Sequence, residues 1–325
     1  MQTCFGFGSP VVTPHGKGIG SLEESLELNG VDVTILTSNR TPQGGDLRSE
    51  HGLSMFLELE WSDESTATLL FDTGASGAVL DHNLKASGIR VADIDWVVLS
   101  HCHGDHTGGL EWLLAQPDGE FLVITHPEIS RSVYKTQPDF HFIGMEAPSL
   151  RGLGPERWIE TRSPIQLAKG IWVSGEIPRV TEFERSRPHM VCLRDGVIET
   201  DGEPDDMALA LDMGARGGVL LAGCSHAGPV NTVMAASELL PAGVASLVGG
   251  LHLYDADESV LEDTGRSLEN LVGDGVISGH CTGIRGERML DATFGQRHKT
   301  FYTGDVWQFR RGAPDWVAAR EVSPR

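Results

Sequence analysis

Four side chains that commonly bind metal ions lie within six consecutive residues of this chain: His101, His103, Asp105 and His106. The apolar run at 94–99 before them is typical of a buried strand, and the apolar spacing at 110–114 after them is typical of a helix. The ligands are therefore expected on a turn at the carboxyl end of a strand, where open α/β sheets place their binding sites. Without a cation, so many imidazole and carboxylate groups would be costly to remove from water. The sequence therefore predicts a metal site at this turn.

Strand-like and helix-like segments alternate in two halves of the chain. The expected strands lie at 31–37, 55–61, 66–71, 94–99 and 121–125, and then at 171–174, 208–213, 219–222, 246–248 and 275–278. Two such halves suit two facing sheets that are covered outside by helices. We expect an irregular arm at 1–24 and one structural domain at 25–325, with a loop-like stretch at 138–163. The charged, Pro-containing stretch 177–203 is expected to be either a lid or dimer-contact element or a solvated connection.

Composition narrows the classes of function. The chain has 25 basic and 46 acidic residues, a formal net charge of −21, which disfavours a nucleic-acid partner because phosphate neutralisation needs a basic face. No run of about 18 apolar residues is present, so no membrane span is expected. Residues 1–14 carry no secretory signal pattern. Three of the five cysteines lie inside candidate metal motifs, which favours reduced thiols and a cytoplasmic location.

Several motifs together resemble the metallo-β-lactamase superfamily. The segment His101-x-His103-x-Asp105-His106 resembles its signature, and residues 71–74 resemble its early Asp motif. The later motifs follow the order of the branch that includes the archaeal dihydropterin-(ribofuranosyl)aminobenzene-phosphate synthase and its bacterial relatives: 175–179, 205–209, 223–228, 249–253 and 280–283. The resemblance spans roughly residues 25–305. It implies an α/β αββα sandwich of two facing mixed sheets flanked by helices, and a metal-dependent hydrolase or, more rarely, an oxidoreductase.

The resemblance also implies two cations. One would be held by His101, His103 and His226, and the other by Asp105, His106 and His280. Each cation would then have three protein ligands and an open position for water, as catalytic zinc sites have. Two zinc ions are expected, with manganese or iron as alternatives.

Other residues in these motifs have roles that the sequence leaves open. Cys224 follows Gly223 where many superfamily members have a bridging Asp, and it is either a thiolate ligand or a packed thiol. Glu176 and Asp206 are candidate ligands or hydrogen-bonding supports. Asp72 is either an orienting residue beneath the metal turn or a simple turn residue.

Two residues are candidates for contact with the substrate. His252 follows Gly249 and Gly250, which would let the backbone approach a ligand closely. We interpret His252 as a catalytic group that protonates the leaving group, or else as a structural histidine. Arg179 is either a surface residue or a binder of a substrate carboxylate or phosphate through its planar guanidinium.

The leading functional hypothesis is hydrolysis of a small anionic ester, lactone, amide or phosphoester by hydroxide held between two cations, with Asp105 orienting it. The alternatives are a dihydropterin-linked synthase and an iron-dependent oxidoreductase. The expected partner is a small-molecule substrate, and a homodimer is possible.

Overall fold

The first of two large sheets comes mainly from the N-terminal half of the chain. The computed structural model describes residues 26–42, 45–145, 150, 152–313 and 317–318. In this part, the strand order is β19-β18-β1-β2-β3-β4-β5-β8. The bounds are β1 Leu28–Thr37, β2 Ser54–Trp61, β3 Thr66–Phe71, β4 Trp96–Val98, β5 Leu122–Thr125, β8 Trp158–Glu160, β18 Val306–Arg310 and β19 Val317–Ala318. Strands β3, β4, β5 and β8 are parallel, so β3, β4 and β5 end at one edge.

The second sheet has the order β17-β16-β15-β14-β13-β10-β9 among the described residues. Its strands are β9 Ile165–Ala168, β10 Ile171–Val173, β13 Ala208–Leu211, β14 Gly218–Ala222, β15 Val244–Gly250, β16 Val272–Gly279 and β17 His298–Thr300. Strands β14 to β17 are parallel. Their buried runs of Val, Leu and Ile are what a parallel sheet covered on both faces requires.

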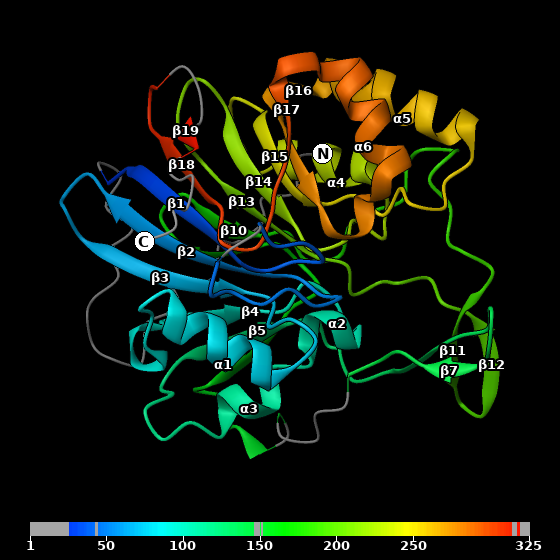
Figure 1. The fold of residues 1–325 in the computed structure, drawn as a ribbon, viewed down its shortest axis with the longest axis horizontal. Helices are drawn as coiled ribbons and strands as arrows, with labels where there is room; N and C mark the ends of the chain where they lie inside the picture. The colour runs from blue at the N-terminus through cyan, green and yellow to red at the C-terminus, as the bar shows by residue number, and fades with distance from the viewer. Residues whose placement is uncertain (1–25, 43–44, 146–149, 151, 314–316, 319–325) are drawn as a thin grey trace, which may run out of the picture.

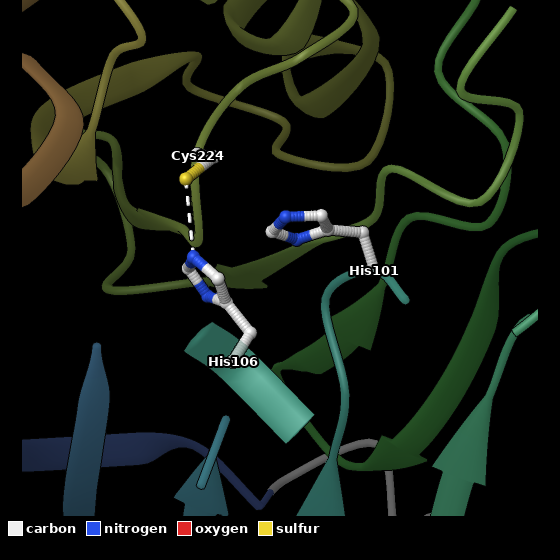
Figure 2. Close-up of side chains that lie close together, drawn as sticks. All are labelled: His101, His106 and Cys224. Atoms are coloured by element: carbon white, nitrogen blue, oxygen red, sulfur yellow. Dashed lines mark hydrogen bonds between the residues drawn. The ribbon is translucent and has the colours of Figure 1, made fainter. Parts of the chain in front are cut away.

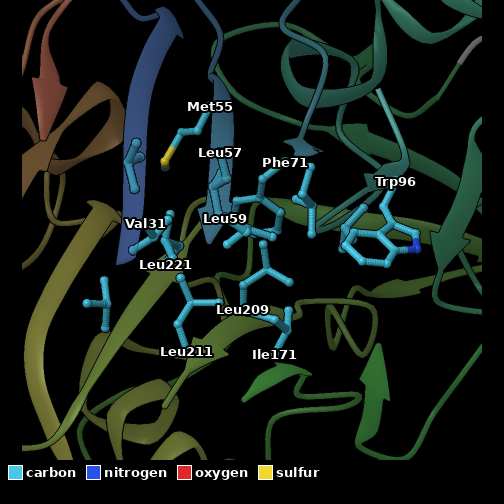
Figure 3. Close-up of a cluster of buried hydrophobic side chains, with 14 of the residues drawn as sticks. Val31, Met55, Leu57, Leu59, Phe71, Trp96, Ile171, Leu209, Leu211 and Leu221 are labelled. Atoms are coloured by element: carbon cyan, nitrogen blue, oxygen red, sulfur yellow. The ribbon is translucent and has the colours of Figure 1, made fainter. Parts of the chain in front are cut away.

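Helices cover the outer faces of both sheets (Figure 1). Helices α1 (Gly77–Ala86), α2 (Gly104–Thr107) and α3 (Leu110–Leu114) belong to the first half, and α4 (Pro229–Ser237), α5 (Glu258–Leu271) and α6 (Gly283–Phe294) to the second. Short 3-10 turns lie at Val91–Asp93, His280–Thr282 and Gly295–Arg297. Apolar side chains of both sheets, among them Leu57, Phe71 and Leu221, fill the space between the sheets (Figure 3). The expected αββα sandwich is therefore confirmed.

A third, four-stranded sheet projects from the sandwich (Figure 1). Its order is β12-β11-β6-β7, with β6 Ser132–Lys135, β7 His141–Phe142, β11 Met190–Arg194 and β12 Val197–Thr200. The stretch 177–203 thus contributes two strands to this sheet, and the stretch predicted as loop-like, 138–163, contains β7 and β8. The predicted arm at 1–24 lies outside the described residues. No helix in the described part of the chain is long and apolar enough to cross a membrane.

Candidate metal centre

The candidate ligands come from strand ends that meet at one edge of the sandwich. The turn after β4 carries His101–His106, and the turns after β14, β15 and β16 carry Cys224–His226, His252 and His280. Because β14, β15 and β16 are parallel neighbours, their carboxyl ends lie side by side. The structure therefore brings together all six residues predicted from the sequence as metal ligands.

Asp72 supports the metal turn from below. It ends β3 and is fully buried, and its Oδ1 accepts a hydrogen bond from the backbone N of Ser100 at 2.7 Å. Its Oδ2 accepts from Ser100 Oγ and from His106 Nδ1, both at 2.7 Å. Since His106 Nδ1 is the donor in this bond, the lone pair of its imidazole is on Nε2. Asp72 thus orients His106, as the resemblance implied.

His101, His103 and His226 form the first group of donors. The centroids of each pair of rings lie 4.6 Å apart, and His101 Nε2 lies 3.1 Å from His103 Nδ1. All three rings are buried, yet Nε2 of His103 and Nε2 of His226 have no hydrogen-bond partner. Burial lowers the pKa of His103 to about 3, so the ring is neutral and keeps a lone pair. Buried nitrogens without partners are rare in native proteins and call for an explanation such as a bound ion.

Asp105, His106 and His280 form the second group. Asp105 Oδ2 lies 3.4 Å from His280 Nε2 and 3.8 Å from His106 Nε2, and these two nitrogens are 3.1 Å apart. His280 Nδ1 lies 2.8 Å from Asn39 Oδ1 and donates to it, because a carbonyl oxygen can only accept. The Nε2 lone pairs of His106 and His280 therefore face each other.

Two facing lone pairs at this distance repel unless a positive charge lies between them. In a tetrahedral zinc site with Zn–N bonds of roughly 2.0–2.1 Å, two nitrogen donors lie roughly 3.3–3.4 Å apart, close to the observed separation. Burial opposes a charge on His106, but the carboxylates of Asp72 and Asp105 outweigh burial and raise its pKa, and the same negative charges would stabilise a metal cation at Nε2. The second group therefore fits a cation.

Cys224 lies between the two groups. Its Sγ is 3.1 Å from His106 Nε2 and 3.1 Å from Cys281 Sγ. Figure 2 shows the side chains of Cys224, His101 and His106 pointing toward one another, and their donor atoms lie within 4.8 Å of each other. Burial and the adjacent Cys281 raise the pKa of the Cys224 thiol, so the thiol is neutral in the absence of a metal.

The two other candidate carboxylate ligands have partners of their own. Glu176 Oε1 contacts His126 Nε2 at 3.0 Å and also pairs with Arg162. Asp206 Oδ2 accepts from the backbone N of Ala227 at 2.6 Å, and burial raises its pKa to about 8. Neither carboxylate belongs to a group of donor atoms that could hold an ion in the described residues.

Arg179 lies behind the first group of donors. Its Nη2 lies 3.0 Å from Glu203 Oε2, and Glu203 Oε1 lies 2.5 Å from His226 Nδ1. Arg179 is therefore connected to the candidate metal centre through Glu203.

His252 separates two cavities. It has a left-handed backbone with φ 46°, its ring centroid lies 4.2 Å from that of His226, and neither ring nitrogen has a hydrogen-bond partner. Burial and then His226 hold the pKa of His252 well below its usual value, so the ring is neutral. A cavity of about 610 Å³ opens over His103, Asp105, Cys224, His226, His252 and His280. A second cavity of about 690 Å³ shares His226 and His252 with it.

Sequence reasoning missed three supporting residues: Glu203, Asn39 and His51. His51 Nε2 lies 3.4 Å from Asp105 Oδ2. None of the three lies in a histidine-rich motif, and tertiary packing alone brings them to the centre. Glu203 lies two residues before the motif at 205–209, and this proximity is the one sequence signal that points to it.

Fold and site together define the class of protein. Two facing mixed sheets with helices outside, and histidines at the strand ends, are the architecture of metallo-β-lactamase enzymes. Residues 51–131 match the metallo-beta-lactamase superfamily. The chain therefore carries a metallo-beta-lactamase superfamily domain, and its relatives and structural neighbours include enzymes of this fold.

Particular relatives extend the similarity beyond that domain. The chain is 29% identical over 291 residues to the 7,8-dihydropterin-6-methyl-4-(beta-D-ribofuranosyl)-aminobenzene-5'-phosphate synthase of Methanocaldococcus jannaschii, covering 87% of this chain and 98% of that protein. It is 28% identical over 241 residues to an uncharacterized protein of the same organism, covering 73% and 86%. The solved structure of Tm1679, described as a metal-dependent hydrolase of the beta-lactamase superfamily, has a TM-score of 0.73 at 23% identity, covering 86% and 99%.

Proposed function

We propose that the protein is a metal-dependent hydrolase of a small anionic ester, lactone, amide or phosphoester. It would bind two divalent cations, and zinc is the expected metal. The observation that carries the proposal is the pair of His106 and His280 Nε2 atoms, which face each other at 3.1 Å with Asp105 beside them. When bound, the cations would supply a water that is nucleophilic near neutral pH and would polarise the substrate oxygen.

The residues of the chain divide this work. His101, His103 and His226 would hold one cation, and Asp105, His106 and His280 the other. Asp105 would also orient the attacking water, since it lines the cavity of about 610 Å³ over the centre. His252 faces the same cavity as a neutral imidazole that can relay a proton to the leaving group. Glu203, held by Arg179, fixes the ring of His226.

Metal content and turnover test this proposal together. We expect the purified protein to contain about two equivalents of metal by elemental analysis. Dialysis against a chelator should abolish hydrolysis of a panel of nitrophenyl esters and phosphoesters, and added zinc should restore it. Full hydrolysis by the metal-free protein would refute the proposal. An iron-loaded protein with oxygen-dependent turnover would instead indicate an oxidoreductase.

The similarity to the Methanocaldococcus synthase over 87% of the chain favours a second candidate function. In this alternative, the same centre would support bond formation between a pterin diphosphate and a phosphorylated ribofuranosyl-aminobenzene, and diphosphate would leave. A reaction in labelled water separates the two functions, because hydrolysis places the label in the product. The synthase reaction would release inorganic diphosphate only when both substrates are present.

A further inference from the structure

The entrance of the cavity over the metal centre is lined by side chains from three separate segments. Lys135 ends β6 of the projecting sheet, Tyr254 follows β15, and Ile284 lies in the first turn of α6. Lys135 Nζ lies 3.4 Å from Tyr254 Oη and 5.8 Å from the centroid of that ring. Lys135 also pairs in register with Met190 on β11, so both side chains are on one face of the projecting sheet, and both line the cavity.

Lys135 carries a charge that no carboxylate in the described part of the chain neutralises by an ion pair. No carboxylate of the described residues lies within 4.0 Å of its Nζ. The other cationic side chain at this entrance, Arg40, pairs with both oxygens of Glu287. In a chain with a net charge of −21, an uncompensated ammonium group beside a metal centre favours an anionic ligand.

Tyr254 offers an exposed aromatic surface beside this ammonium. Tyr254 is 41% exposed, and the neighbouring Ile284 is 61% exposed. The ring centroid of Tyr254 lies 5.2 Å from that of His252. Gly283 has φ +67°, and a Cβ there would lie 2.6 Å from Tyr254 Cβ. The glycine is therefore needed to seat this tyrosine. Aromatic rings attract one another in offset-stacked or edge-to-face arrangements, which contribute about 0.5–1.5 kcal/mol beyond the surface that they bury.

We propose that the cavity selects aromatic anions, with Lys135 pairing with the anionic group and Tyr254 stacking on the ring next to it. The proposal rests on the proposed function only in placing the reacting bond over the metal centre. It makes the projecting sheet a specificity element, because β6 supplies the cationic residue.

Calorimetric titration of the zinc-loaded protein tests this selectivity with three probes: phenyl phosphate, inorganic phosphate and phenol. Phenyl phosphate should bind more tightly than either of the others. Lys135→Gln should weaken phenyl phosphate binding about tenfold, the loss expected for one charge-assisted hydrogen bond. Lys135→Arg should retain most of the affinity. Tyr254→Leu should reduce the preference for phenyl phosphate over inorganic phosphate, and Tyr254→Phe should preserve that preference.

Two control variants separate recognition from damage to the sheet. Tyr134→Leu changes the neighbouring residue on β6, which lies on the opposite face, and Lys299→Gln removes a lysine on β17 that does not line the cavity. Both should bind phenyl phosphate as the wild type does. Equal affinity of the wild type and Lys135→Gln, or equal binding of phenol and phenyl phosphate, would overturn the proposal.

Turnover by the same proteins distinguishes this failure from failure of the proposed function. Unchanged phenyl phosphate binding in Lys135→Gln, together with chelator-sensitive hydrolysis, would remove the recognition proposal alone. If Lys135→Gln weakens phenyl phosphate binding as expected but the metal-free protein still hydrolyses its substrates, the proposed function alone is refuted.

Discussion

Oε1 of Glu203 lies 2.5 Å from Nδ1 of His226, and both side chains are buried. A carboxylate this close to the second ring nitrogen of a metal-binding histidine would orient the ring once it accepts the N–H hydrogen bond, and it would make the histidine a stronger ligand. Glu203 is in turn held by Arg179, so the support extends one residue further from the centre.

Replacement of Glu203 by Gln should therefore weaken the first cation position. We expect zinc affinity to fall by about 10- to 100-fold, the usual effect of losing such a support. Competition with a fluorescent chelator measures this loss. Glu176→Gln is the matched control, because Glu176 pairs with His126 and Arg162 and should leave zinc affinity unchanged. Equal effects of the two variants would contradict a role for Glu203 at His226.

The absorption spectrum of the cobalt-substituted protein should show whether Cys224 binds the metal through its sulfur. Its Sγ lies 3.1 Å from His106 Nε2, and thiolates bind zinc and cobalt well. We expect a sulfur-to-cobalt charge-transfer band in the near ultraviolet that disappears in Cys224→Ser. Cys192→Ser, which removes a buried cysteine on β11, should keep the band. If Cys224→Ser also keeps it, the thiol is a packing group.

The metal-free protein should lose stability as pH falls below about 6.5, the usual pKa of an unfolded histidine. Burial lowers the pKa of His101 and His226 well below the ordinary value and that of His103 to about 3. The unfolded chain therefore binds protons that the folded chain does not. Each such histidine lowers the unfolding free energy by about 1.4 kcal/mol for every unit that the pH falls below this value.

Urea unfolding of the metal-free protein between pH 6.5 and 5 measures this slope. In His103→Asn, the slope should be shallower by about 1.4 kcal/mol per pH unit, which corresponds to one fewer proton. Equal slopes in the two proteins would show that His103 is protonated in the folded state.

Gly223 leaves room for the support beneath the metal turn. A Cβ there would lie 2.1 Å from Ser100 Oγ and 2.9 Å from Asp72 Oδ2. Gly223→Ala should displace these buried groups and lower the unfolding free energy by about 1–3 kcal/mol, as overpacking does. Gly152→Ala is the control, because apart from its chain neighbours no atom of the described residues lies within 4 Å of its Cβ position. Equal thermal stability of both variants would contradict the tight packing at Gly223.

The sequence predicted the parts of the centre that are local in the chain. The turn at 101–106 was visible because its ligands are adjacent and an apolar run precedes them. His226 and His280 also follow buried runs, so each could be placed at a strand end. The sandwich followed from the two sets of strands and from the resemblance.

Residues that reach the centre through long-range packing could not be predicted in this way. Glu203 meets His226 because the chain returns after β12, and Lys135 reaches the cavity because β6 pairs with β11. The projecting sheet was missed because its strands lack one buried and one exposed face, which would produce alternating apolar and polar residues in the sequence. In β12, for example, all four residues are exposed.

The pairing of β6 with β11 has a mechanical consequence for the whole molecule. The first half of the chain supplies β6, β7 and the histidines of the 101–106 turn, whereas the second half supplies β11, β12 and the remaining imidazoles. The hydrogen-bonded strands β6 and β11, outside the sandwich, thus connect the same two halves of the chain that the ions would connect inside it. If one half moved against the other, both the hydrogen bonds between β6 and β11 and the bonds to the ions would have to break. Two independent sets of bonds would therefore restrain the distance between the histidine rings of the two halves.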